Sequence, residues 1–177
     1  MHPRQSTKDE LEKLYRDHRE GLYAYSLSLT RSELIAEDAL QNGFLRLVHS
    51  QAAWDRLNAH NGNRVAYLFK SVRNAAIDLG RSVKRQNSLS QALFGAYGEF
   101  SLIQEPIENA LVEERSEILR KAIDRLDDKD QEAIVLKLYG GLTFEQAGEI
   151  ANVSPKTIAI RYRRTLGKLE EYLKGVL

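Results

Sequence analysis

Apolar residues recur at every third or fourth position through most of the chain, which is the spacing of one face of an α-helix. The pattern predicts a first long helix that ends near Thr30, a second helix with an apolar stripe between positions 36 and 48, and a third helix over about 65–83. It is lost over 84–106 and returns from Ile107. A sustained period of two, typical of strands, occurs nowhere. We therefore expect an all-α protein.

A segment near the C-terminus, residues 143–168, has the chemistry of two short helices joined by a tight turn. It holds a capping box, a residue that tolerates positive φ in the turn, and a cap followed by proline at the start of the second helix. The residues that supply these features, in chain order, are Thr143, Gln146, Asn152, Ser154 and Pro155. Capping, turn and apolar spacing agree, so this segment is predicted to be a helix-turn-helix.

The second helix of this motif is strongly basic. Between Ser154 and Lys168 there are five basic residues and no acidic one. An ordinary helical hairpin with a solvated basic face would explain the charge alone, but the second helix of a helix-turn-helix is the one that enters the major groove. The candidate DNA-contacting residues on it are Lys156, Thr157, Ile160, Arg161, Arg163 and Arg164.

Two further surfaces carry candidate chemistry. Residues 50–64 are rich in turn formers and are expected to form a loop before the third helix. The outer face of that helix combines basic side chains with an aromatic and an amide, which suits a nucleic-acid strand, although exposed helix faces of this composition are common. On the second helix, Leu45 is displayed among polar residues at helical spacing. A single exposed leucine is ordinary, so this feature means little alone.

Composition narrows the class of protein. The chain has 177 residues, is 42% hydrophobic and 29% charged, and contains no cysteine, which excludes disulfides and thiolate metal sites. Its four histidines are scattered, and no apolar run approaches the roughly 18 residues that span a bilayer. No phosphate loop, His-Glu metal motif or nucleophile elbow is present. We expect a cytoplasmic protein that is not an enzyme, needs no cofactor and does not insert into a membrane.

The net charge of +1 conceals a division of charge along the chain. Residues 1–90 carry fourteen basic and ten acidic residues, whereas residues 91–177 carry twelve and fifteen. Between 64 and 85 six bases face one acid, and between 99 and 132 eleven acids face five bases. Contact with nucleic acid must therefore be confined to particular faces.

The order of the segments resembles the extracytoplasmic-function (ECF) class of bacterial RNA polymerase sigma factors of the sigma-70 family. The likeness covers nearly the whole chain and rests on LYRDHREGLYAYSLSLT, AEDALQNGFLRL, AYLFKSVRNAAIDLGR and GGLTFEQAGEIANVSPKTIAIRYRRTL. It implies two small helical domains: sigma region 2 over 1–85 and sigma region 4, with the helix-turn-helix, over 107–177. A linker over 86–106 would join them.

The resemblance implies roles for individual residues. Region 2 would bind the clamp helices of core RNA polymerase and melt the minus-ten element, and region 4 would bind the minus-thirty-five element through the helix-turn-helix residues named above while touching the polymerase flap. An anti-sigma factor is a further implied partner. Clamp contact falls on Asp38, Gln41, Asn42 and Leu45, and minus-ten contact on Asn61, Asn63, Arg64, Tyr67, Lys70, Arg73, Asn74 and Asp78.

Some residues depart from the family pattern, and other classes of protein stay open. Asn42 stands where the family usually has an acid, Tyr67 where it commonly has tryptophan, and Ala159 and Ile160 where it usually has polar or basic residues. The main alternative is a free-standing helix-turn-helix regulator whose N-terminal domain dimerises or senses a ligand. A purely structural module is the third hypothesis, and it leaves the basic helix unexplained.

Overall fold

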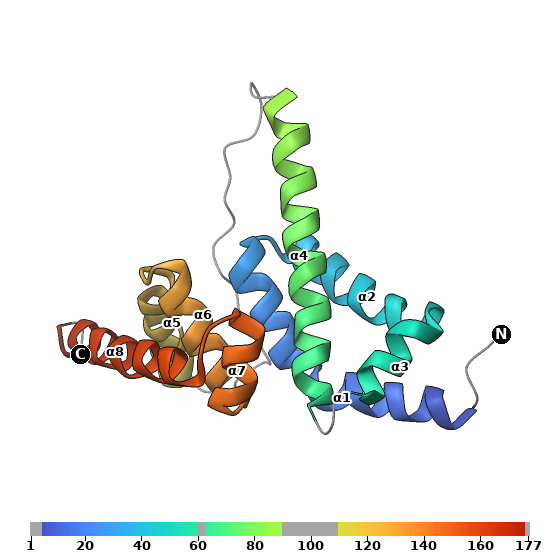
Figure 1. Cartoon of the computed structure of the whole chain (residues 1–177). Coiled ribbons are helices and arrows are strands. Elements are labelled where there is room, and N and C mark those ends of the chain that lie inside the picture. Colours follow the sequence, from blue (N-terminus) through green and yellow to red (C-terminus); the bar gives the residue numbers. More distant parts are fainter. Residues whose placement is uncertain (1–4, 60–62, 90–109, 176–177) are drawn as a thin grey trace.

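The computed structural model describes residues 5–59, 63–89 and 110–175 (Figure 1). Within these ranges the chain forms α-helices and no strand, so the predicted all-α class is confirmed. None of the helices described there is long and apolar enough to cross a membrane. The helices are α1 (Gln5–Thr30), α2 (Glu33–His49), α3 (Gln51–Ala59), α4 (Arg64–Leu89), α5 (Ala110–Asp124), α6 (Asp128–Leu138), α7 (Phe144–Ala151) and α8 (Pro155–Lys174).

The N-terminal half is built around α4, which packs against α1 and α2. Leu22 and Tyr25 of α1, Leu40 of α2 and Phe69 of α4 are all buried in one cluster. Gly43 lets α2 approach α4 closely, because a Cβ atom there would lie 2.7 Å from a methyl group of Val72. Gly43 therefore sets how closely α2 packs on α4.

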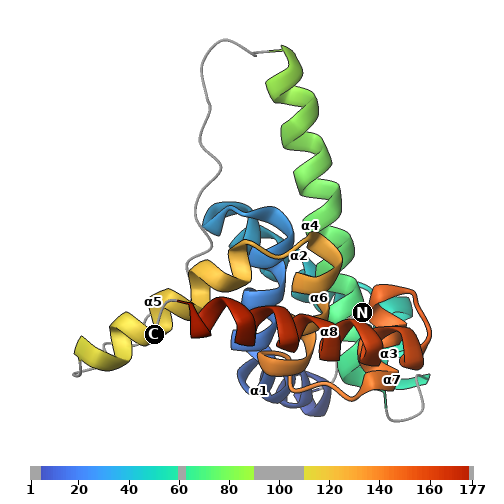
Figure 2. The same ribbon diagram turned by 90° about the vertical axis from the view of Figure 1, so that its left-hand side faces the viewer.

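Two of the predicted boundaries in this half are wrong. Residues 51–59 form the helix α3 and not a loop, because Ser50 accepts a hydrogen bond from the backbone N–H of Ala53 and caps the helix. Trp54 and Leu57, three positions apart, then bury the same face of α3. The third helix was predicted to end at about position 83. In the structure it continues as α4 to Leu89, since no glycine or proline follows to stop it. The far end of α4 projects beyond the other helices in two views at right angles (Figures 1 and 2).

In the C-terminal half, α6, α7 and α8 pack together with α5, and the helix-turn-helix has the local structure that its sequence predicts. Thr143 and Gln146 form a complete capping box at the start of α7. Asn152 has φ 56° in the turn, and Ser154 caps α8 with Pro155 in its first turn. These predictions are confirmed, and they fix the direction in which α8 leaves the turn.

The two halves share one hydrophobic core. The cluster that holds Tyr25 and Phe69 continues into Leu136 of α6 and Ile150 of α7. Close backbone approach supports it, because a Cβ atom on Gly21 of α1 would lie 2.6 Å from the carbonyl oxygen at the end of α6. In Figure 1, α7 lies beside the lower part of α4. The contact brings α6 and α7 against the face of α4 on which minus-ten residues were predicted.

Candidate nucleic-acid and polymerase interfaces

The exposed start of α8 is the first candidate surface. Lys156, Ile160 and Arg163 are exposed, and Ile160 keeps 54% of its surface accessible. Thr157 is partly engaged in the cap, since its backbone N–H donates to the Ser154 hydroxyl at 3.1 Å. Arg161 is half-buried. The exposed Ile160, Lys156 and Arg163 thus lie on the N-terminal half of α8, the helix that a helix-turn-helix presents to the major groove.

Arg164, one turn after Ile160 on α8, is also exposed but has a partner within the chain. Together with Lys168 it binds the carboxylate of Asp130, whose side chain is fully buried at the start of α6. Burial by itself would raise the pKa of Asp130, but the hydrogen bonds from Lys168 and Arg164 outweigh it and hold that pKa below its ordinary value. The predicted DNA-contacting arginine is therefore also a tie between α8 and α6.

The outer face of α4 is the second candidate surface, and acidic residues of the C-terminal half lie against it. Lys70 Nζ is 3.0 Å from a carboxylate oxygen of Glu149 on α7, which also accepts a hydrogen bond from the Asn63 amide. Arg73 Nε is 3.3 Å from a carboxylate oxygen of Glu132 on α6. Three predicted minus-ten residues thus have partners in the other half of the chain.

Glu132 also joins this face to the core of the N-terminal half. The buried hydroxyl of Tyr25 donates to its carboxylate at 2.7 Å. Burial of the phenol, together with the negative charge of Glu132, raises the pKa of Tyr25 well above its ordinary value. Tyr25 therefore remains a neutral donor, and Glu132 is held between it and Arg73.

The other predicted minus-ten residues are distributed differently. Arg64 at the start of α4 pairs with Glu10 at 2.9 Å and lies over the ring of Trp54. Tyr67 is half-buried and packs against the main core, while Asn74 is exposed. Asn61 lies outside the described residues. The structure thus gathers Asn63, Arg64, Tyr67, Lys70, Arg73 and Asn74 at the start and along one side of α4.

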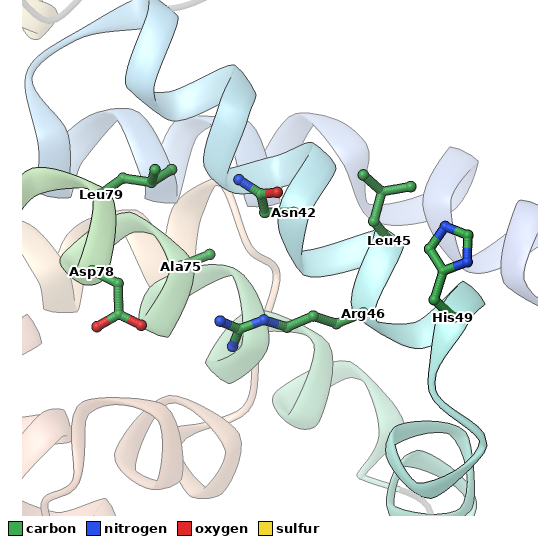
Figure 3. A pocket seen from close by; sticks show the side chains of 7 residues that line it. All are labelled: Asn42, Leu45, Arg46, His49, Ala75, Asp78 and Leu79. Atoms are coloured by element: carbon green, nitrogen blue, oxygen red, sulfur yellow. The ribbon is translucent and has the colours of Figure 1, made fainter. Parts of the chain in front are cut away.

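The third candidate surface is an open pocket between α2 and α4 (Figure 3). Asp38, Gln41, Asn42 and Leu45 of α2 are exposed, as their spacing predicts, and Leu45 keeps 46% of its surface accessible. The residues that line the pocket are Asn42, Leu45, Arg46, His49, Ala75, Asp78 and Leu79.

Sequence reasoning gave three of these polar lining residues no role in clamp contact. Arg46 shares the polar face of α2 and reaches toward α4 in Figure 3, and His49 extends the same row by one turn. Asp78 was predicted to contact the minus-ten element, but it lies in this pocket with the predicted clamp residues. The helical spacing of α2 already puts Arg46 on the same outer face as Leu45 and could have found His49 one turn further on, whereas the placement of Asp78 depends on where α2 packs.

A second depression lies on the C-terminal half, and it is apolar. Its lining includes Leu138 of α6 and Leu166 of α8, which keep 50% and 39% of their surfaces accessible. Among the residues that the structure describes, no three His, Asp or Glu side chains are grouped so that they could hold a metal ion.

Comparison with known families and structures identifies both halves. The model of sigma-70 region 2 matches residues 14–86, and a model of sigma-70 region 4 matches residues 116–169. The chain belongs to the ECF class of sigma-70 factors. All the candidate residues on α2, α4 and α8 fall inside the two matched regions.

Relatives of known function agree over almost the whole length of this sigma factor. The chain is 29% identical to the ECF RNA polymerase sigma factor SigM of Bacillus subtilis, covering 94% of this chain and 97% of the relative. It is 26% identical to the RNA polymerase sigma factor CarQ of Myxococcus xanthus, over 96% and 92% of the two chains. The sigma factor RpoE of Bartonella quintana, solved in complex with the anti-sigma factor NepR, superposes with a TM-score of 0.70 at 25% identity, covering 97% of this chain and 98% of that one.

These matches decide between the hypotheses for function. The protein is an RNA polymerase sigma factor, which binds core polymerase and directs promoter recognition and transcription initiation through region 2 at the minus-ten element and region 4 at the minus-thirty-five element. A free-standing regulator is not favoured, because region 2 is matched together with the helix-turn-helix region.

Proposed function

We propose that the pocket between α2 and α4 is the main contact of this sigma factor with the clamp helices of core polymerase. The observation that carries the proposal is Leu45, an apolar side chain 46% exposed at the rim of a pocket whose lining combines the apolar Ala75 and Leu79 with polar and charged residues. An exposed apolar anchor surrounded by polar groups is the usual centre of a protein interface. Asp38, Gln41 and Asn42 supply the polar rim on the same face of α2.

Asp78 belongs to this polymerase surface in our proposal, and so do Arg46 and His49. All three line the same pocket as Leu45. The pocket therefore offers a carboxylate, a guanidinium and an imidazole around an apolar centre, and such a mixture favours a partner helix with charges of both signs.

The minus-ten element is proposed to bind along α4 and the segment before it. Lys70, Arg73 and Arg64 supply positive charge for the DNA backbone, and Tyr67 supplies a ring edge or face beside it. Asn61, Asn63 and Asn74 carry amides that can pair with an exposed base edge. This set offers the three kinds of group that hold an unpaired base.

The minus-thirty-five element is proposed to bind at the start of α8. Lys156, Thr157, Arg161 and Arg163 offer donors, while the exposed Ile160 can contact a thymine methyl group. Arg164 shares its guanidinium with Asp130, so its proposed role is contact with a flanking phosphate and support of α8.

Two further partners follow from the family and from the solved relative. The RpoE protein was crystallised with an anti-sigma factor, and we propose that this cytoplasmic sigma factor is also held by one. The polymerase flap is proposed to contact the leucine-lined depression with Leu138 and Leu166, since both of these apolar side chains are exposed.

The polymerase assignment is tested by Leu45→Ala, which removes most of the exposed anchor without disturbing the core. We expect binding to core polymerase to weaken by roughly 1–3 kcal/mol, because truncation of an interface anchor has a cost of this size. Binding is measured by fluorescence anisotropy of labelled sigma factor titrated with core enzyme, followed by promoter-dependent run-off transcription.

The matched control is Leu34→Ala on the same helix. Leu34 is 73% exposed but lies outside the pocket, so its truncation should leave core binding unchanged. If the two variants bind core polymerase equally well, the pocket is not the clamp contact.

A further inference from the structure

The outward face of α8 presents one apolar side chain between two cations. Lys156, Ile160 and Arg163 follow i, i+4, i+7 spacing, and all three are exposed. Ile158 and Thr165 are buried on the opposite side of the helix. A single exposed apolar residue is common on protein surfaces. Ile160, however, is 54% exposed at the centre of the row that faces away from the core, on the helix that a helix-turn-helix turns toward the bases.

Two polar side chains one turn away from Ile160 have partners within the chain. Before it, the hydroxyl of Thr157 lies 2.8 Å from the hydroxyl of Ser154 in the cap of α8. After it, the guanidinium of Arg164 is tied to the buried carboxylate of Asp130. Two groups that could bond a base edge beside Ile160 are thus drawn into contacts that hold the motif together.

An isoleucine side chain can distinguish bases by one feature of the major groove. It neither donates nor accepts hydrogen bonds, so it forms no bond with the O4 acceptor of thymine or with the N4 donor of cytosine. It can pack on the C5-methyl group of thymine, which uracil and unmodified cytosine lack. 5-Methylcytosine carries a methyl group on the same ring carbon. Ile160 therefore fits a methyl group and not one particular base.

We propose that α8 selects its minus-thirty-five element through the C5-methyl group of one pyrimidine, which Ile160 reads, so that 5-methylcytosine can replace thymine there. This inference rests on the proposed binding of the minus-thirty-five element at the start of α8. Lys156 and Arg163, on either side of Ile160, hold the flanking phosphates, and such contacts position a helix without reading sequence. Methylation of a cytosine at this position would then strengthen binding of the sigma factor to the promoter.

The position is located first by selection from a duplex library randomised over the promoter region. Holoenzyme assembled from core polymerase and the unaltered sigma factor should select a thymine at one position of the minus-thirty-five element. Holoenzyme with Ile160→Ala should lose the preference at that position and keep it at the others. A selected element without such a thymine overturns the inference alone. If no minus-thirty-five element is selected at all, the proposed binding at α8 is overturned with it.

Binding is then measured on four duplexes of the selected sequence that differ at this position only. Two carry thymine or uracil opposite adenine, and two carry 5-methylcytosine or cytosine opposite guanine, so the members of each pair differ by one methyl group. The methyl group should tighten binding of the unaltered holoenzyme roughly three- to fivefold in both pairs, the factor that matches burial of one methyl group. Ile160→Ala should bind the two members of each pair alike. If thymine and uracil bind equally to the unaltered holoenzyme, the inference is overturned, while the selected element still supports binding at α8.

The matched control is Leu166→Ala, which shortens another exposed apolar side chain of the same helix. Leu166 lies in the depression with Leu138 and not on the row of Ile160, so this variant should keep the methyl effect in both pairs. Far-UV circular dichroism verifies that both variants keep their helices. Loss of the methyl effect in Leu166→Ala as well as in Ile160→Ala would overturn the assignment of the effect to Ile160.

Discussion

The basic faces of α4 and α8 have similar compositions and opposite availability. On α4, Lys70 and Arg73 lie against carboxylates of region 4, whereas Lys156 and Arg163 at the start of α8 are exposed. The sequence predicts that both faces contact nucleic acid. The difference shows that the charge of a helix face indicates what it can bind, while the tertiary contacts decide when it is free to bind.

A second contrast lies within α8 itself. Arg163 and Arg164 are neighbours in the chain and both are exposed, yet Arg164 is tied with Lys168 to the buried Asp130. Successive residues of a helix point about 100° apart, so neighbours can belong to different surfaces. A run of basic residues therefore divides into residues available to DNA and residues that hold the motif together.

The largest effect is expected from breaking the α4 surface. Combined Arg73→Ala and Asn74→Ala should sharply reduce transcription from a duplex promoter, since each lost contact to DNA has a cost of roughly 1–3 kcal/mol. A promoter with a pre-melted minus-ten bubble should recover part of the activity, because the variant then no longer has to open the duplex. Run-off transcription on the two templates measures both effects.

The control for this variant is its binding to core polymerase, which should stay at the level of the unaltered protein because neither residue lines the α2 and α4 pocket. Equal activity of variant and unaltered protein on both templates would show that α4 does not read the minus-ten element.

A smaller effect is expected from separating Arg163 from Arg164. Arg163→Ala should weaken binding to promoters that depend on the minus-thirty-five element by about 1–3 kcal/mol if it contacts a base, with the midpoint of thermal unfolding unchanged. Arg164→Ala should instead lower that midpoint, because it removes a partner of the buried Asp130. Footprinting and calorimetry on the two variants distinguish the roles. Equal midpoints would mean that Arg164 does not support α8.

The local features of the fold could be predicted from sequence because each depends on residues a few positions apart. The capping box of Thr143 and Gln146, the left-handed Asn152 and the cap at Ser154 all need only near neighbours. The helix α3 was missed although its signals are also local. Turn formers beyond it hid the cap at Ser50 and the apolar pair Trp54 and Leu57.

The long-range contacts could not be predicted in the same way. Arg73 and Glu132 are 59 positions apart, and Lys70 and Glu149 are 79 apart. The sequence shows a basic stretch over 64–85 and an acidic one over 99–132, but not that particular members pair. The place of Asp78 in the pocket could not be predicted for the same reason. It lies at the edge of two faces of α4, and only the position of α2 assigns it to the pocket.

The smallest effect is expected from removing the charge of Asp130, the buried partner of Arg164 and Lys168. Asp130→Asn keeps the shape of the buried side chain but removes its charge. Near neutral pH it should lower the free energy of unfolding by up to about 1 kcal/mol, because its partners Arg164 and Lys168 are about half exposed. Because the folded protein holds the pKa of Asp130 below its unfolded value, this stabilisation is present above pH ~3.9 and is lost as pH falls through the folded pKa. The gap between unaltered protein and variant should therefore narrow below about pH 4.

Urea unfolding over a series of pH values measures this gap, with Asp128→Asn as the control, since Asp128 is exposed in the same first turn of α6. A gap that is the same size at every pH would show that the charge of Asp130 does not hold α8 in place.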